Sequence, residues 1–470
     1  MKTFMKTLPL SYVLLLFLTV SALCQQPENS FTTAFYASRC GVVLDSDVYK
    51  GGGTDVTEPL QAVLDRAPKL GRLHLILDGA ARISKCLKVY SNTTIECPDK
   101  SCGLFLSDNS NCSLLCNVTG DMEHIRDRNI TLIGGTYNNN SPGQVHHLPN
   151  KKGENGVFSK DDKWVFALEF YGIEQLLLRD VTIANQRTFA LTMANWKYVK
   201  MENIHIDRRV RKDKENQDGL HFFGPGRFLT LRDIHGNSGD DFIALTPDEH
   251  DSKSAIEDVL IDGVQLDDAD QGIRMLVRGK GKLDRVIVRN VTGTYRSYGF
   301  IINPWYAGNG GHYGNIMFDM IDLRPMKNNY TYSPPFLFKL GGNIESLTLK
   351  NIYHHTPDYD HCLFIVGGEY YLNRPERPNY PTKIDRLIID GLYIDERNVQ
   401  SVPETYIRVK SQVGVLSVNN VILRRAEELP KSGSLINVDG GAIQELILNN
   451  ISAPELKLRG LTSLGVRYLL

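Results

Sequence analysis

The sequence predicts an all-β fold: a single-stranded right-handed parallel β-helix with a short capping helix at its N-terminal end. Three observations predict it. A short unit recurs along the chain, most copies lie 23 to 30 residues apart, and helical periodicity is almost absent after residue 70. A repeat of this length, made of short strands and turns, is typical of stacked coils. A propeller is the rival fold, but its blades need about 40–50 residues each.

Residues 1–24 have the features of a secretory signal peptide. Lys2 and Lys6 precede an apolar run at 12–18, and small residues follow at 21 and 22. The run is short for a membrane span, and we expect no span elsewhere. The protein is therefore expected to be secreted, or periplasmic or in the cell envelope, with a lipoprotein anchored at Cys24 less favoured. Residues 25–470 would form a single β-helix domain.

Charge and cysteine content narrow the class of partner and cofactor. The net charge is −1 and the pI is about 6.9, so no global field attracts nucleic acid. Six cysteines fall between Cys40 and Cys116, where export would permit disulfides, and Cys362 would stay unpaired. The sequence contains no Cys-x-x-Cys pair, the spacing that is typical of a zinc site. We expect no cofactor and no metal.

The first elements can be read in order. Residues 51–55 are a glycine-rich loop, and Thr57 can cap a helix that runs to about Leu64 with apolar residues at helical spacing. Strands are expected at 73–77 and at 83–89. The helix comes before the first coils, so we expect it to cap the N-terminal end of the stack.

The repeat itself begins near residue 130. Each unit reads apolar, any residue, apolar, any residue, then Asn, Asp or Gly, then a further apolar residue. Because one coil cannot bury its apolar face alone, stacking must place the copies in register. Asn at the turn could also form side-chain ladders. The copies begin at residues 176, 199, 229, 259, 286, 347, 387, 416 and 446, with a degenerate copy at 316–319.

Three carboxylates gather in two neighbouring units. Aligning Asp218-Gly219-Leu220 with Asp241-Phe242-Ile243 stacks Asp218 and Asp241 in one column, with Asp240 one residue earlier. Like charges at close range raise each other's pKa, so this arrangement is costly. Asp-Gly and Gly-Asp are also ordinary turn pairs. Two such pairs in register, one coil apart, favour a catalytic site over two turns.

At these residues the chain resembles the pectin-lyase-like superfamily, and within it the polygalacturonase and rhamnogalacturonase family, glycoside hydrolase family 28. Residues 216–219 match the family's Asn-Thr-Asp-Gly motif except for Gln217, and 239–241 match its Gly-Asp-Asp motif. The resemblance implies that Asp240 is the general acid, and that Asp218 and Asp241 hold and deprotonate the attacking water. It implies inverting hydrolysis of a pectic or related acidic polysaccharide. Side chains splayed from adjacent coils could reach the separation of about 6.5–9.5 Å that inversion uses.

Two departures from the family concern the bound sugar. Gln271 stands in the column where the family has a histidine, and could hydrogen-bond sugar hydroxyls. The family's Arg-x-Lys, expected near 299–303, is absent, and Arg274 lies in the equivalent column one coil earlier. A guanidinium matches a carboxylate bidentately, so we expect Arg274 to contact the substrate. His221, in the same column as Arg274, could line the groove or be a surface imidazole.

Aromatic side chains could complete the groove. Trp305 and Tyr306 follow the strand near residue 300 and could stack on sugar faces. We therefore expect a polysaccharide or oligosaccharide as partner.

Two other functions stay open. In a calcium-dependent polysaccharide lyase, Asp218, Asp240 and Asp241 would hold Ca²⁺ and Arg274 would abstract a proton. In a non-catalytic carbohydrate-binding β-helix, replacing Asp240 by Asn would change nothing.

Overall fold

The computed structural model describes most of the chain after residue 33. Residues 35–470 form one compact unit. The proposed signal peptide, Trp305 and Tyr306 lie outside the described residues, and so does part of the proposed domain 25–470. No helix in the described part is both long enough and apolar enough to cross a bilayer. The described residues are 34–144, 165–209, 216–251, 253–304, 311–326, 335–355, 362–367, 383–399, 401–429, 433–453, 456–461 and 466–469.

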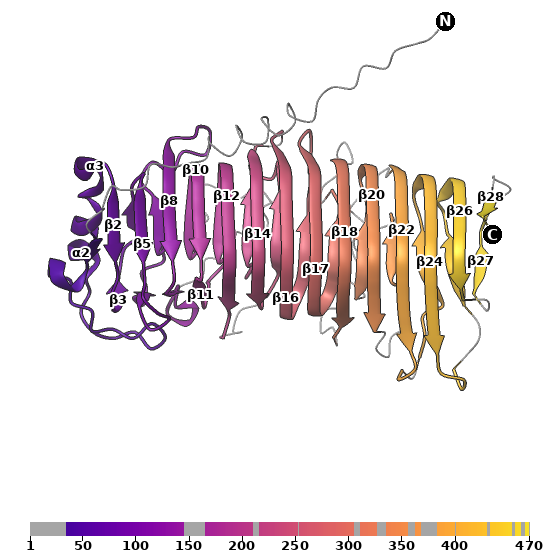
Figure 1. Cartoon of the computed structure of the whole chain (residues 1–470), viewed down its shortest axis with the longest axis horizontal. Helices are drawn as coiled ribbons and strands as arrows, with labels where there is room; N and C mark the ends of the chain where they lie inside the picture. Colours follow the sequence, from indigo (N-terminus) through magenta and orange to yellow (C-terminus); the bar gives the residue numbers. More distant parts are fainter. Residues whose placement is uncertain are drawn as a thin grey trace, which may run out of the picture. The chain divides into compact units, whose positions relative to one another are not determined.

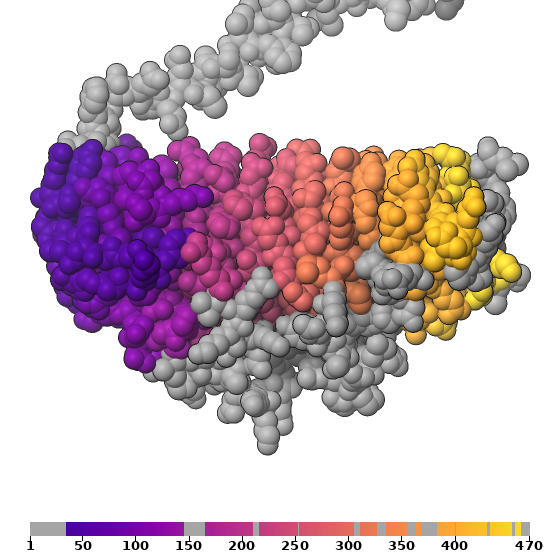
Figure 2. Space-filling view, turned by 90° about the horizontal axis from the view of Figure 1, so that it is seen from below, coloured from indigo at the N-terminus to yellow at the C-terminus, as the bar shows by residue number. Residues whose placement is uncertain are grey.

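The fold is the predicted right-handed parallel β-helix. Strands of successive coils pair in parallel and follow one another in chain order, from indigo to yellow (Figure 1). The same order of coils is visible in the space-filling view (Figure 2). The first ladder consists of β2 (Leu73–Ile76), β5 (Thr93–Glu96), β8 (Asp127–Ile133), β10 (Leu168–Arg179), β12 (Leu191–Asp207), β14 (Gly226–Gly236), β16 (Ala255–Met275), β17 (Lys282–Ile302), β18 (His312–Pro325), β20 (Asn343–His355), β22 (Lys383–Glu396), β24 (Gln412–Arg425), β26 (Ala442–Ser452) and β28 (Val466–Leu469).

Two further ladders complete the coils. The second starts with β3 (Ala80–Ile83), β6 (Gly103–Leu106), β9 (Thr136–Asn138) and β11 (Thr182–Ala184), then continues along the end of β12. The third, which carries the candidate site, also uses parts of β10, β12, β16 and β17. Its other strands are β4 (Leu87–Val89), β7 (Leu115–Asn117), β13 (Leu220–Phe223), β15 (Asp241–Thr246), β19 (Phe336–Leu340), β21 (Phe364–Val366), β23 (Thr405–Val409), β25 (Ser434–Val438) and β27 (Lys457–Arg459).

The repeat copies predicted from sequence lie in one column of the first ladder. Leu176 pairs with Val199, Val199 with Leu229, and the series continues through the degenerate copy at Ile316 to Leu446. The unit's fifth residue has a left-handed backbone conformation, which Asn, Asp and Gly tolerate best. Its φ is 60° at Asp180 and 82° at Gly263. The Asn, Asp and Gly in the pattern therefore mark the turn of each coil.

The N-terminal end differs slightly from the prediction. Helix α2 (Thr57–Leu64) lies where it was predicted, but the predicted cap is wrong, because Val56 is at the N-cap and Thr57 is the first helical residue. The helix buries its apolar face and is followed by α3 (Ala67–Leu70). Both lie at the indigo end of the stack (Figure 1). The single strand predicted at 83–89 is wrong: β3 ends at Ile83 and β4 begins at Leu87, because the residues between them turn a corner of the coil. The short strand β1 (Ala34–Tyr36) precedes these elements.

The cysteines in the part of the chain that the structure describes are free, and no disulfide joins them there. Cys86 Sγ and Cys116 Sγ, from neighbouring coils, lie 2.7 Å apart, which makes this pair the best placed for one. Cys362, expected to be unpaired, is free and buried.

Candidate active site

The two acidic motifs lie on adjacent coils of the third ladder. Leu220 pairs with Ile243, so Asp218, two residues before Leu220, stands opposite Asp241 at the start of β15. Asp241 in turn pairs with Gln271. Between the coils, a Cβ on Gly219 would lie 2.3 Å from the Phe242 carbonyl oxygen. Only glycine permits this approach, which explains the Asp-Gly pair in the motif.

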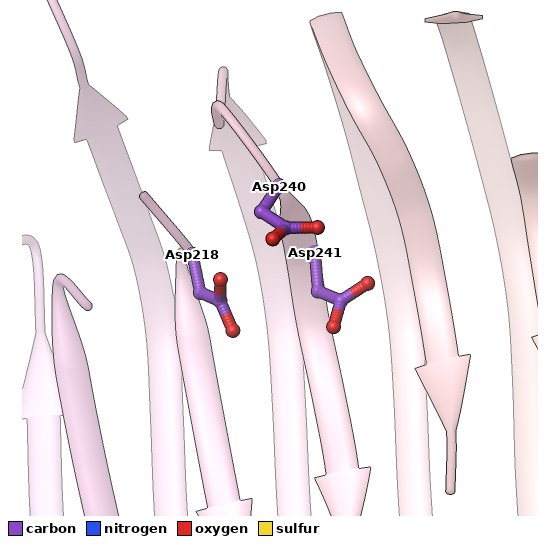
Figure 3. Close-up of side chains that lie close together, drawn as sticks. All are labelled: Asp218, Asp240 and Asp241. Atoms are coloured by element: carbon purple, nitrogen blue, oxygen red, sulfur yellow. The ribbon is translucent and has the colours of Figure 1, made fainter. Parts of the chain in front are cut away.

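The three carboxylates lie side by side (Figure 3). One oxygen from each of Asp218, Asp240 and Asp241 can be chosen so that all three lie within 4.8 Å of one another. This is close to the rise between stacked strands, about 4.8 Å, and shorter than the separation of about 6.5–9.5 Å typical of an inverting acid and base. The nearest carboxyl oxygens are therefore closer together than the separation that we expected from the sequence.

Asp218 and Asp241 are held in the same way. The Nδ1 of His221 lies 2.7 Å from Asp218 Oδ2, and Arg274 Nη1 donates to Asp241 Oδ2 at 3.3 Å. The other oxygen of each carboxylate, Oδ1, is buried and has no hydrogen-bond partner among the described residues. A buried acceptor left unpaired costs about 1–3 kcal/mol, and more when it is charged. A polar ligand would therefore bind at these two Oδ1 atoms.

Asp240 has a different environment. Gln271 Nε2 donates to Asp240 Oδ1 at 2.7 Å, and among the described residues no cationic side chain hydrogen-bonds to this carboxylate. Burial of the carboxyl, reinforced by the charges of Asp218 and Asp270, raises the pKa of Asp240 well above its ordinary value. Gln271 cannot titrate, so it fixes the orientation of the carboxyl without competing for its proton.

The pKa values of the other two carboxyls are also raised. Burial raises the pKa of Asp218 to about 7, although the hydrogen bond with His221 opposes this, and the charge of Asp241 adds to it. Burial raises the pKa of Asp241 to about 7 against the opposing effect of Arg274. Above pH 7 the site therefore favours two ionised carboxylates beside one protonated carboxyl.

Of the residues predicted to bind substrate, three are described by the structure and lie at the carboxylates. Gln271 contacts Asp240, and Arg274 contacts Asp241 and is only 9% exposed. His221 is 4% exposed, with both ring nitrogens close to polar atoms. These contacts bring all three residues to the carboxylates. Contact with substrate stays a prediction for each of them, and for Trp305 and Tyr306 outside the described part.

Two residues near the site were missed by the sequence analysis. Glu249 Oε2 lies 3.3 Å from His221 Nε2, and no repeat or motif marks it. Lys339 lies in the same column as Arg274, two coils further on, with Ile301 between them. Burial lowers the pKa of Lys339 to about 7. Extending the column of Arg274 by two coils would have identified Lys339, whereas Glu249 follows the end of its strand and carries no such signal.

Comparisons with known proteins agree on the architecture. In sequence, the chain matches no protein-family model and no curated protein. An exopolygalacturonase from Thermotoga maritima matches in structure with 14% identity, covering 90% of this chain and 93% of its own, at a TM-score of 0.54. A Yersinia enterocolitica family 28 exopolygalacturonase has 14% identity, 88% and 79% coverage, and a TM-score of 0.51.

A tailspike protein mutant of E. coli bacteriophage HK620 also matches, with 12% identity, coverage of 94% of this chain and 81% of its own, and a TM-score of 0.56. At such low identities a structural match shows the fold alone. The chain therefore has a parallel β-helix fold, and its architecture resembles that of these two exopolygalacturonases and the tailspike protein.

Proposed function

We propose that this chain is a glycoside hydrolase that cleaves a pectic or related acidic polysaccharide. One observation carries the proposal. Asp218 and Asp241 each have one oxygen beside a basic side chain and one buried oxygen that finds no hydrogen-bond partner in the described part of the chain, next to a third carboxyl of raised pKa. Glycoside hydrolysis requires a carboxylic acid beside an ionised carboxylate, and this site supplies one acid and two candidate bases.

The chemistry follows from these roles. Asp240 donates its proton to the glycosidic oxygen as the bond from that oxygen to the anomeric carbon breaks. A water held between Asp218 Oδ1 and Asp241 Oδ1 attacks the anomeric carbon from the opposite face, and one of these carboxylates takes its proton. Because water attacks directly from the face opposite the departing oxygen, the product inverts its configuration, although the nearest carboxyl oxygens lie within 4.8 Å of one another and inverting enzymes typically use about 6.5–9.5 Å. Exchange with solvent returns each carboxyl to its starting state.

Two observations support the proposed substrate class. Two proteins of similar fold are exopolygalacturonases. Arg274, and Lys339 when it is protonated, add positive charge along one column of the same ladder, which suits a chain of acidic sugars. We propose further that the protein acts outside the cytoplasm, on the basis of the signal-peptide features of residues 1–24.

The calcium-dependent lyase is less well supported. Ca²⁺ takes about six to eight oxygen ligands, whereas Asp218 Oδ2 and Asp241 Oδ2 are already hydrogen-bonded by His221 and Arg274. A bound divalent cation would be repelled by the guanidinium, and by the imidazole when it is protonated. The site therefore does not fit calcium, and no step of the proposed reaction uses a metal.

A digestion panel tests the proposed function. Polygalacturonan, rhamnogalacturonan and neutral plant and algal glycans are incubated with the protein, with and without a chelator. We expect new reducing ends that are insensitive to chelator and no ultraviolet absorbance from unsaturated products. Proton NMR of the first product should show the inverted anomer. Unsaturated, chelator-sensitive product would instead support the lyase, and a retained anomer would make one of the carboxylates a nucleophile.

The activity of the enzyme should depend on pH in a defined direction. Because the pKa of Asp218 and of Asp241 is about 7, both become protonated below that pH and can no longer accept a proton from water. We expect kcat/KM to fall about tenfold per pH unit below pH 7. Initial rates recorded between about pH 5 and pH 10 measure this fall in kcat/KM. Activity that still rises as the pH falls below 6 would contradict the assignment of bases.

A further inference from the structure

His221 lies between two carboxylates that come from different coils. Its Nδ1 is 2.7 Å from Asp218 Oδ2, and its Nε2 is 3.3 Å from Glu249 Oε2 and 3.0 Å from Thr246 Oγ1. The Thr246 hydroxyl donates its own proton to the Phe222 carbonyl at 3.3 Å, so towards His221 it acts as an acceptor. Both ring nitrogens therefore face acceptors, and an imidazole facing acceptors on both sides is stable only when both nitrogens carry a proton.

The ring has little freedom to leave this position. The Phe189 ring stacks on it at 4.3 Å between centroids and 8° between planes, and the Phe223 ring lies 4.6 Å away. Burial alone would lower the pKa of His221, but the hydrogen bonds with Asp218 and Glu249 outweigh it and raise the pKa to about 9. The charged groups near the ring are Asp218, Asp240, Asp241, Glu249, Arg274 and Arg278.

Glu249 is itself held in place from the next coil. Asp248 Oδ1 accepts from the backbone N–H of Arg278 at 2.7 Å, and Asp248 Oδ2 accepts from that of Gly279 at 2.6 Å. Arg278 Nη1 then donates to the Glu249 carbonyl oxygen at 2.9 Å. Although burial opposes it, the hydrogen bond to His221 and the charge of Arg278 lower the pKa of Glu249. Glu249 therefore stays ionised where it faces His221.

We propose that Glu249 is a positioning residue that keeps His221 doubly protonated, so that His221 holds Asp218 ionised with its Oδ1 turned towards the attacking water. The functional part of this inference rests on the proposed hydrolase. Without the second carboxylate, His221 would lose a proton near neutral pH. Asp218 would then face Asp241 without a compensating charge, and like-charge repulsion would favour its protonated, inactive form.

The test is the titration of His221 in wild type and in Glu249→Gln. The full-length protein is labelled with ¹⁵N-histidine, and the His221 signal is assigned with a His221→Asn variant. A carboxylate within about 4–6 Å raises the pKa of a neighbouring base by about 1–3 units. Replacing Glu249 by the neutral isostere should therefore lower the His221 midpoint by about 1–3 units. An unchanged midpoint would overturn the proposal, whatever the enzyme's activity.

A second readout links the charge of His221 to catalysis. Loss of the Asp240 proton also ends activity at high pH, so the alkaline limb of kcat/KM in wild type follows whichever of Asp240 and His221 loses its proton first. In Glu249→Gln, where the His221 midpoint is lower, we expect the limb to lie at or below that midpoint. If the variant keeps its activity above its own His221 midpoint, the charge of His221 has no part in the reaction and the positioning role fails. If the midpoint moves and wild type hydrolyses nothing in the panel, the proposed function fails while the charge state of His221 stands.

The chain offers a matched control. Glu345 faces another histidine, His312, at 2.7 Å, but this pair is about half exposed and lies outside the site. Glu345→Gln removes a carboxylate from a histidine in the same way. We expect it to leave the His221 midpoint and the pH profile unchanged, so an equal shift in both variants would also overturn the proposal.

Discussion

The Asp240→Asn variant is expected to hydrolyse its polysaccharide about 10²–10⁴-fold more slowly than wild type, with the loss in kcat. Asn has nearly the same shape as Asp but carries no acidic proton, so the leaving oxygen would depart without protonation. Gln271 can still donate to the amide oxygen as it does to Asp240 Oδ1. Ground-state binding should persist, so KM should change little. The measurement is kcat and KM on the substrate that the digestion panel identifies.

A control variant must distinguish a loss of catalysis from a loss of folded protein. Asp262 is a partly buried carboxylate on β16, hydrogen-bonded by Arg289 and Asn290 at 2.7 Å each, and has no contact with the site. Asp262→Asn should keep full activity. If Asp240→Asn is as active as wild type, Asp240 is not the acid, and the non-catalytic carbohydrate-binding function gains support.

The thermal stability of the same variant has a predictable sign. Because the pKa of Asp240 is raised in the folded state, the stability that this group contributes is lost as the pH rises through that value. Asn cannot ionise and does not suffer this loss. Asp240→Asn should therefore unfold at the same temperature as wild type or higher in alkaline buffer. This result would indicate that the acidic site is maintained for its chemistry and at some cost in stability.

The fold could be predicted because each coil repeats the same physical requirement. A left-handed residue must follow each short strand, and Asp180, Asn203 and Gly263 meet this requirement, with φ of 60°, 51° and 82°. Once the turn is fixed, stacking fixes the register of the strands, which is why the copies fall in one column. Met320 takes the same conformation, with φ of 56°, without a favourable residue, so the sequence signal is weakest there.

The acids of the site could be predicted for the same reason. Asp218 and Asp241 belong to strands whose register the repeat sets, so their stacking follows from the sequence. The distances could not be predicted, because they depend on side-chain rotamers as well as on the rise between coils. The contact between Asp218 and His221 could not be predicted either: the sequence places His221 in the column of Arg274 but does not show which neighbour its ring contacts.

Glu249 could not be found from sequence for a different reason. It follows β15 in a turn that Asp248 fastens to the backbone of Arg278, thirty residues later, so its position depends on a contact between coils. Turns of this kind give no repeating pattern in the sequence. In a β-helix the strands are therefore predictable and the groups supporting the site from the loops are not.

Replacing Phe338 by Ala should lower the free energy of unfolding by about 3–5 kcal/mol. The Phe338 ring is fully buried in β19 and contacts three other rings. Its centroid lies 4.7 Å from that of Phe300 and 5.4 Å from that of Phe364, on the two adjacent coils, and 5.2 Å from that of Phe318. Ala would remove these contacts and leave a cavity, which stacked coils cannot close without losing their register. Urea-induced unfolding measures the change.

Tyr353→Ala provides the comparison, because Tyr353 also stacks on a ring of the next coil. Its centroid lies 4.8 Å from that of Tyr393, but Tyr353 is only partly buried and lies outside the core. An outward cross-strand pair contributes about 0.2–1 kcal/mol, so the difference between the two variants isolates the effect of burial. Since each coil contacts only its neighbours, Phe338→Ala should leave kcat unchanged well below its unfolding temperature. Equal, small losses of unfolding free energy in both variants would mean that the interior repacks around a missing ring. Backbone pairing and turns would then stabilise the stacked coils more than the columns of side chains do.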